Sequence, residues 1–278
     1  MRCRATSVLT GSVIATFGGC GFEVPGPQAG IDGGNDVVPG IDAGSVIAER
    51  CQTWGMPADP SIRLCLDFED SFTTIVRDGS GLQHDASAEA VTTMPRTGEL
   101  AARVDTASRL RVPESVDLIA SKITFGMWIH PDLPIPDDAE RGLLAYGARY
   151  RLTVEADNQI TCRIGDDEAD TKAEIPINLL GTWTHVACTF DGNELRAYVA
   201  GSVAGCRRMS RFAGATTGGL AIGARLGDNG QLADQFVGGI DDVHIYARSL
   251  SPSEICSAAG GANCSAMCPP GGPGGDGD

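Results

Sequence analysis

Apolar and polar residues alternate along several short segments of this chain. In residues 123–130 every odd-numbered position is apolar, and residues 160–164 and 186–190 repeat the same period of two. This period is typical of β-strands with one buried face. Further short apolar segments are interpreted as strands at residues 64–68, 143–146, 150–154, 195–199 and 220–223. No segment keeps a 3.6-residue period long enough for a core helix, so the pattern predicts an all-β chain.

The closing segment, residues 238–255, is interpreted as a strand that ends in a short helical turn. Val243 and Ile245 share one side of this strand with Asp241. Residues 251–252, Ser-Pro, are typical of an N-cap and a first helical position. The alternation predicts that the carboxylate of Asp241 points toward the apolar layer, where a buried carboxylate must find donors or a cation.

Four segments resemble, in order, strands of the laminin-G-like, concanavalin-A-like jelly-roll family. They are residues 123–131, 181–201, 220–223 and 238–255, and the resemblance as a whole covers residues 62–255. The second segment contains a Trp-Thr-His-Val-Ala strand, an Asp-Gly turn and a Tyr-Val-Ala-Gly strand. The resemblance implies an antiparallel two-sheet jelly-roll sandwich and a role in extracellular recognition. Because the family includes lectin-like, adhesive and structural modules, it does not identify a ligand.

The resemblance also implies a chemistry for Asp241. In related jelly-roll folds an aspartate at the start of the last strand binds a structural calcium, and backbone carbonyls complete the shell. Oxygen ligands suit Ca²⁺, and Asp67, Glu69 and Asp78 are further candidate ligands. The alternative is a carboxylate that accepts hydrogen bonds from backbone amides or from an arginine.

Two tryptophans lie opposite the apolar sides of their strands, Trp128 and Trp183. A tryptophan on a concave sheet face can stack on a sugar, because its ring packs against sugar C–H groups. The related family also uses tryptophan at both positions for packing. Ligand contact and packing are therefore both open interpretations of these two residues.

An enzymatic interpretation rests on Asp67 and Glu69. On a strand these carboxylates would point the same way, as in related jelly-roll glycosidases, and retaining hydrolysis needs two carboxyl groups about 5 Å apart. The family's third acidic position is Ser71 here, and the pair lies on the first predicted strand rather than mid-sheet. No Ser-His-Asp or Cys-His arrangement is recognisable in the sequence. The chain is therefore expected to be non-catalytic, with a glycoside hydrolase as the alternative.

The N-terminus has the features of an export signal. Residues 1–19 begin with a basic Met-Arg-Cys-Arg and contain an apolar stretch that is too short to span a bilayer. Residues 17–20, Phe-Gly-Gly-Cys, resemble a bacterial lipoprotein box, which implies lipidation of Cys20. Gly21 in place of Asp favours the outer membrane of a Gram-negative bacterium. The alternatives are an ordinary cleaved signal, which would give a secreted protein, and a chain that is not exported.

Eight cysteines follow Cys20, and an even number in an exported chain suggests disulfides. About a hundred pairings are possible. Cys162 and Cys188 lie on the apolar sides of their strands and are predicted to pair. The other predicted pairs are local, Cys51–Cys65 and Cys256–Cys264. Two cysteines have no predicted partner, Cys206 and Cys268.

The chain is expected to have four parts. Residues 1–19 form the signal peptide, and residues 20–49, rich in Pro, Gly and Asp, form a disordered tether. The jelly-roll domain is expected over residues 50–256, followed by a Cys-containing Gly/Pro-rich tail at residues 257–278, the end of which is expected to be disordered.

The formal net charge is −15. Such a surface disfavours nucleic acid and anionic lipid headgroups as partners, so membrane contact is expected only through the lipid anchor. Together these features favour a non-catalytic cell-surface lipoprotein that recognises a glycan or a cell-surface protein. A structural spacer without a small ligand is a further alternative.

Overall fold

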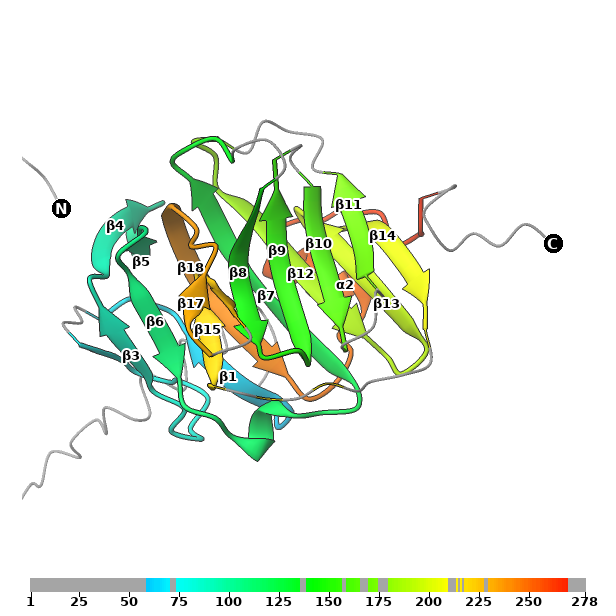
Figure 1. Ribbon diagram of the computed structural model, residues 1–278. Coiled ribbons are helices and arrows are strands. Elements are labelled where there is room, and N and C mark those ends of the chain that lie inside the picture. Colours follow the sequence, from blue (N-terminus) through cyan, green and yellow to red (C-terminus); the bar gives the residue numbers. More distant parts are fainter. Residues whose placement is uncertain are drawn as a thin grey trace, which may run out of the picture. The chain divides into compact units, whose positions relative to one another are not determined.

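The computed structural model describes residues 59–70, 74–135, 139–156, 159–165, 170–174, 180–209, 214, 216, 218–227 and 230–269. Over these residues the chain forms two antiparallel β-sheets that face each other, together with the helix α2 (Figure 1). The predicted all-β jelly-roll sandwich is therefore confirmed. The predictions for the signal peptide, Cys20, the tether, Cys51 and the last nine residues lie outside the described residues.

The first sheet, sheet A, contains the strands of three of the four segments that carry the resemblance, residues 123–131, 181–201 and 238–255. Its eight strands include a path of seven hydrogen-bonded neighbours, and β1 (Ile62–Leu66) pairs separately with β18. The seven are, in order, β14 (Ser202–Arg208), β13 (Glu194–Val199), β12 (Thr184–Phe190), β7 (Ile123–Pro131), β18 (Gly238–Tyr246), β5 (Glu99–Val104) and β4 (Thr92–Arg96).

The second sheet, sheet B, also has eight strands. They are, in order, β11 (Asp170–Glu174), β10 (Gln159–Ile164), β9 (Tyr150–Glu155), β8 (Glu140–Tyr146), β15 (Leu220–Ile222), β6 (Arg109–Val112), β3 (Ala86–Glu89) and β2 (Ile75–Val76). The short strands β16 (Arg225–Leu226) and β17 (Leu232–Ala233) pair with each other, and a 3₁₀ turn, η1, spans Val116–Leu118.

The core lies between the two sheets and follows the alternation seen in the sequence. The odd-numbered residues of β7 from Ile123 to Ile129 are fully buried and pack against sheet B. The rings of Phe125 and Tyr150 lie 5.0 Å apart, which joins β7 to β9. Burying one face of each sheet in this way removes apolar surface from water, and it leaves the even-numbered side chains of β7 on the outer face of sheet A.

Three disulfides are present in the described part of the chain. Cys162–Cys188 and Cys256–Cys264 are the pairs that the sequence predicts, and the third is Cys206–Cys268. The Cys162–Cys188 bond crosses the core from β10 in sheet B to β12 in sheet A. Cys65 is also disulfide-bonded.

The C-terminal segment is attached to the edge of sheet A. Two disulfides tie it down, one from α2 and one from β14. The amide of Val203 on β14 also donates to the carbonyl of Ser265, at 2.8 Å. Residues 259–269 therefore cover part of a strand edge that would otherwise present unpaired backbone groups.

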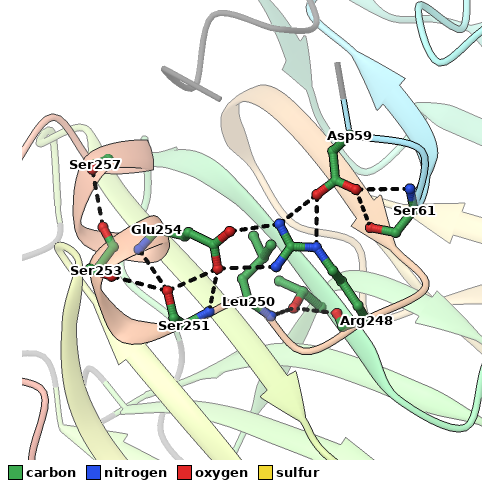
Figure 2. Close-up of polar contacts among 9 residues, drawn as sticks. Asp59, Ser61, Arg248, Leu250, Ser251, Ser253, Glu254 and Ser257 are labelled. Atoms are coloured by element: carbon green, nitrogen blue, oxygen red, sulfur yellow. Dashed lines mark hydrogen bonds and ion pairs between the residues drawn. The ribbon is translucent and has the colours of Figure 1, made fainter. Parts of the chain in front are cut away.

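The helix α2 (Pro252–Ala258) begins as the sequence predicts. Ser251 is its N-cap and Pro252 its first residue, and Glu254 completes a capping box with Ser251. The guanidinium group of Arg248 lies between Glu254 and Asp59, as Figure 2 shows. It thereby connects the helix to the start of the described chain. Hydrogen bonds from Arg248 lower the pKa of Glu254 to about 2, although burial opposes them.

We expect Glu254→Gln to lower the free energy of unfolding by about 1 kcal/mol at pH 7, because the ion pair is only partly buried. Glutamine can still accept the cap hydrogen bond, so the variant isolates the charge. The folded-state pKa lies below the ordinary 4.5. The stabilisation is therefore complete above pH 4.5 and is lost as the pH falls toward about 2. Urea unfolding of both proteins between pH 7 and 2 measures this, and a pH-independent difference would contradict it.

Candidate recognition site

A β-bulge in β18 decides which way Asp241 points. Ile240 pairs with Ile129, Asp241 pairs with Trp128, and the register then shifts before His244. Asp242 supplies the additional residue and has a positive φ of 48°. Because an extra residue reverses the alternation, Asp241 lies on the outer face of sheet A with Trp128. The prediction that Asp241 shares a side with Val243 and Ile245 is wrong.

Trp128 occupies the centre of a row on this outer face. Its cross-strand neighbours are His185 on β12 and Asp241 on β18. The His185 ring meets the Trp128 ring in an edge arrangement, with 5.5 Å between their centroids. His185 and Asp241 are both buried, whereas Trp128 stays partly exposed. The row thus consists of one partly exposed aromatic ring between two buried polar side chains.

Arg96 reaches this row from β4, at the edge of the sheet. Its Nη1 lies 2.5 Å from Oδ2 of Asp241 and 2.8 Å from Oδ2 of Asp242. The guanidinium carbon is 4.3 Å from the centroid of the Trp128 ring and 5.6 Å from that of Trp183. Two carboxylates and two aromatic rings therefore fix the position of one guanidinium group.

Burial is the largest influence on the pKa values of Asp241 and Arg96. Burial raises the pKa of Asp241, the Asp242 carboxylate raises it further, and the Arg96 guanidinium opposes both. Burial lowers the pKa of Arg96, but its hydrogen bonds to the two carboxylates outweigh burial and raise it. Asp241 thus has the arginine partner that the sequence analysis left open, and calcium binding at this residue stays a prediction.

Trp183 packs on the same face, beside the row. A Cβ atom at Gly239 would lie 2.6 Å from Cη2 of Trp183 and 2.7 Å from Sδ of Met94, so this position of β18 requires glycine. The His130 ring lies 5.3 Å from the Trp183 ring. One side of Trp183 is therefore used for packing, while the residue as a whole remains partly exposed.

The residues that border Trp183 include a charged set and an apolar set. Asp132 Oδ2 lies 2.7 Å from Nη2 of Arg103, and Asp132 Oδ1 lies 3.2 Å from Nδ1 of His130. Leu133 and Leu180 lie on two loops and are 57 % and 40 % exposed. A hydrogen bond from the Gly181 amide to the Pro131 carbonyl connects these loops. We call the set of Arg96, Trp128, His130, Trp183 and Asp241 the Trp–Arg face.

The helix α2 packs against another part of this side of sheet A. Ile255 and Ala258 of the helix join a second apolar cluster with sheet residues such as Tyr198 and Tyr246. His185 and His244 are buried within the same side of the sheet, and burial lowers the pKa of both, that of His185 to about 3. These imidazoles are therefore neutral at neutral pH. The apolar cluster of α2 contains no residue of the Trp–Arg face.

The other predicted calcium ligands lie elsewhere. Both oxygens of Asp78 accept hydrogen bonds, Oδ1 from the amide of Cys65 on β1 and Oδ2 from the amide of His84 in the loop that follows Asp78. The carboxylate of Glu69 accepts from the Leu100 amide, at 3.3 Å. Within the described ranges, these carboxylates form no cluster of potential metal ligands with Asp241.

The two carboxylates on which the glycosidase alternative rests, Asp67 and Glu69, lie beyond the end of β1. Strand β1 ends at Leu66, and Phe68 has a positive φ of 54°. The expectation that the two carboxylates point the same way on a strand is therefore wrong, because neither residue lies on the strand.

One compact group of potential metal ligands occurs in the described segments, namely Glu194, Cys206 and Cys268. Its two sulfurs form a disulfide bond, so they are not available as thiolates.

The helices in the described part of the chain are all too short or too polar to span a membrane.

Comparison with known proteins agrees with this architecture. Residues 104–256 match the family model described as the concanavalin A-like lectin/glucanases superfamily. Because the match covers more than half of the chain, the protein belongs to this family. A comparison with curated protein sequences finds no match.

Several solved structures share the fold. Domain 4 of AbnA, an extracellular GH43 arabinanase from Geobacillus stearothermophilus solved with arabinotriose, is 18 % identical, with 72 % of this chain and 98 % of that chain covered and a TM-score of 0.55. The binding domain of Paraclostridial Mosquitocidal Protein 1 is 16 % identical, with 73 % and 52 % covered and a TM-score of 0.58. The binding domain of botulinum neurotoxin DC, solved with SialylT, is 13 % identical, with 73 % and 52 % covered and a TM-score of 0.56. This chain thus spans about half of each toxin chain, and at these identities the similarity establishes the fold alone.

Proposed function

We propose that this protein is an exported, non-catalytic recognition module that binds a glycan through the Trp–Arg face. The observation that carries the proposal is the clustering of two partly exposed tryptophans around a fixed arginine, outside the apolar cluster that α2 forms with sheet A. Aromatic rings with polar donors and acceptors beside them are suited to sugars, which present C–H groups on one side and hydroxyls at the edges.

The comparisons support a binding role. The arabinanase domain was solved with arabinotriose and the neurotoxin domain with SialylT, so two proteins of the same fold have been studied with glycans. The positions of Asp67 and Glu69 favour a non-catalytic function, because the carboxylate pair expected of a glycosidase does not form on β1. A protein partner, which would use the exposed Leu133 and Leu180, is the competing outcome of the test below.

A glycan array tests the proposal with the purified full chain and two variants. We expect Trp183→Ala to weaken glycan binding at least about tenfold, because it removes an aromatic surface while the Gly239 backbone beneath it remains. Val116→Ala, at a residue that is 80 % exposed on η1, is the matched control and should bind as the unaltered protein does. If Trp183→Ala binds the same glycans as tightly as the unaltered protein does, the glycan does not bind at the Trp–Arg face.

We further propose that the module is held at the outer membrane by a lipid on Cys20. The disulfides support export, since such bonds persist in oxidising compartments. The basic start and apolar stretch of residues 1–19 support a lipoprotein signal.

Cys20→Ala should release the protein from membranes into the soluble fraction, because an acyl anchor binds through burial of its chains. Fractionation of cells that express each form measures this. Cys206→Ala, which removes a cysteine of the domain, controls for a general effect of cysteine loss. Recovery of Cys20→Ala in the membrane fraction at the level of the unaltered protein would contradict the anchor.

A further inference from the structure

The two ion pairs of Arg96 use only one of its nitrogens. Both Asp241 and Asp242 accept from Nη1. Neither Nε nor Nη2 has a hydrogen-bond partner among the residues that the structure describes, and 12 % of the side-chain surface remains exposed. The Nε and Nη2 hydrogens of an arginine are parallel and form a rigid donor fork. This fork is fixed in place because Trp128 supports the guanidinium plane and the carboxylates hold its other edge.

The charges around this fork decide what it can bind. An arginine fork ordinarily favours a carboxylate or a phosphate. Here the Asp242 carboxylate already balances the single positive charge of Arg96. Asp241, whose pKa burial raises to about 8, accepts from the same nitrogen and adds negative charge to the extent that it is ionised. The nearby cation Arg103 is also paired, with Asp132. An anionic ligand would therefore meet no uncompensated positive charge, whereas an uncharged ligand with two neighbouring oxygens would meet two donors without repulsion.

We infer that the Nε–Nη2 edge of Arg96 determines specificity by donating to a vicinal diol of a neutral sugar, and that the face discriminates against acidic sugars. The inference rests on the proposed glycan-binding function. In this arrangement the sugar ring packs against the exposed part of Trp183, and two adjacent hydroxyl oxygens accept from the fork. The carboxylates hold the arginine in position, so the ordering of a long side chain is completed before the ligand arrives.

Calorimetric titration of the full chain tests the inference with three sets of oligosaccharides. These are neutral oligosaccharides, their uronic-acid and sialylated counterparts, and neutral ones whose vicinal hydroxyls are O-methylated. We expect the best neutral ligand to bind at least about tenfold more tightly than its acidic counterpart and than its methylated form, since hydrogen bonds from a charged donor of this kind are worth about that factor.

Arg96→Lys provides a second, independent test. Lysine keeps the positive charge for Asp241 but lacks the fork. We expect it to weaken binding of the neutral sugar by the same factor as O-methylation, and to weaken binding of the methylated sugar no further, because both changes remove the same contact. A merely structural role for Arg96 would weaken both ligands equally.

The outcomes separate the inference from the proposed function. Tighter binding of the acidic sugars, or additive effects of Arg96→Lys and O-methylation, would overturn the diol inference while glycan binding stands. If Arg96→Lys does not fold, the ratio of affinities for the neutral, acidic and methylated sugars still decides the inference. Absence of binding to every oligosaccharide would overturn the proposed function together with it.

Discussion

Replacing Arg96 by alanine should lower the free energy of unfolding by about 3–5 kcal/mol, the typical effect of removing one partner of a buried ion pair. The side chain of Asp241 is only 1 % exposed and that of Arg96 12 %. Without the guanidinium, Asp241 would stay buried beside the Asp242 carboxylate with no cationic partner. The full loss is expected at high pH, where Asp241 is ionised, and proton uptake reduces it near pH 7, because burial raises the pKa of Asp241 to about 8. Denaturant unfolding measures the change, and Arg103→Ala is the control, because that arginine is 55 % exposed and its ion pair should contribute less than about 1 kcal/mol.

The same experiment tests the calcium hypothesis. If Arg96 is the principal partner of Asp241, Arg96→Ala is strongly destabilising and a chelator leaves the melting temperature of the unaltered protein unchanged. If calcium binds there, a chelator lowers that temperature and added calcium restores it, because a ligand of the folded state stabilises by mass action. A small effect of Arg96→Ala together with a chelator-sensitive melting temperature would contradict the arginine account.

Replacing Cys162 and Cys188 together by alanine should destabilise the protein by about 3.5 kcal/mol in the chain-entropy account of disulfides. The bond closes a loop of 26 residues and connects the two sheets through the core. Cys256–Cys264 closes a separation of only 8 residues, so the corresponding double variant should lose about 2.5 kcal/mol. Denaturant unfolding of the two double variants shows which bond stabilises the protein more. An equal or smaller loss for the Cys162–Cys188 pair would contradict the account.

The strands of the core could be predicted from the sequence, because burial on one face leaves a local signature. The period of two in residues 123–130 specifies β7 and its buried side without knowledge of its neighbours. The pairing of Cys162 with Cys188 follows from the same rule, because both residues alternate with the apolar positions of their strands. The cap of α2 is also local, since Ser251, Pro252 and Glu254 lie within four residues.

The site could not be predicted in the same way, because its determinants are local deviations and distant contacts. A bulge at Asp242 reverses the alternation after Asp241, yet nothing in the apolar pattern of β18 indicates an extra residue. The positive φ of Phe68 ends β1 in a similar manner and separates Asp67 from Glu69.

The role of Arg96 is not visible in the sequence for a different reason. It is 145 residues from Asp241 in the sequence and lies on an edge strand whose residues are mostly polar. Only the order of strands in sheet A brings it over Trp128, and an arginine has no local pattern that signals such a contact. The tryptophans were recognisable by their alternation, but the residue that organises them was not.

The central claim, that the Trp–Arg face binds a glycan, is tested most directly by the indole N–H resonances of the protein. The chain has three tryptophans, at positions 54, 128 and 183, so the amide spectrum contains three such signals to assign. On titration with an oligosaccharide selected from the array, we predict that the signals of Trp128 and Trp183 shift in a saturable manner. Saturable binding of the sugar that leaves the Trp128 and Trp183 signals unmoved would contradict the claim.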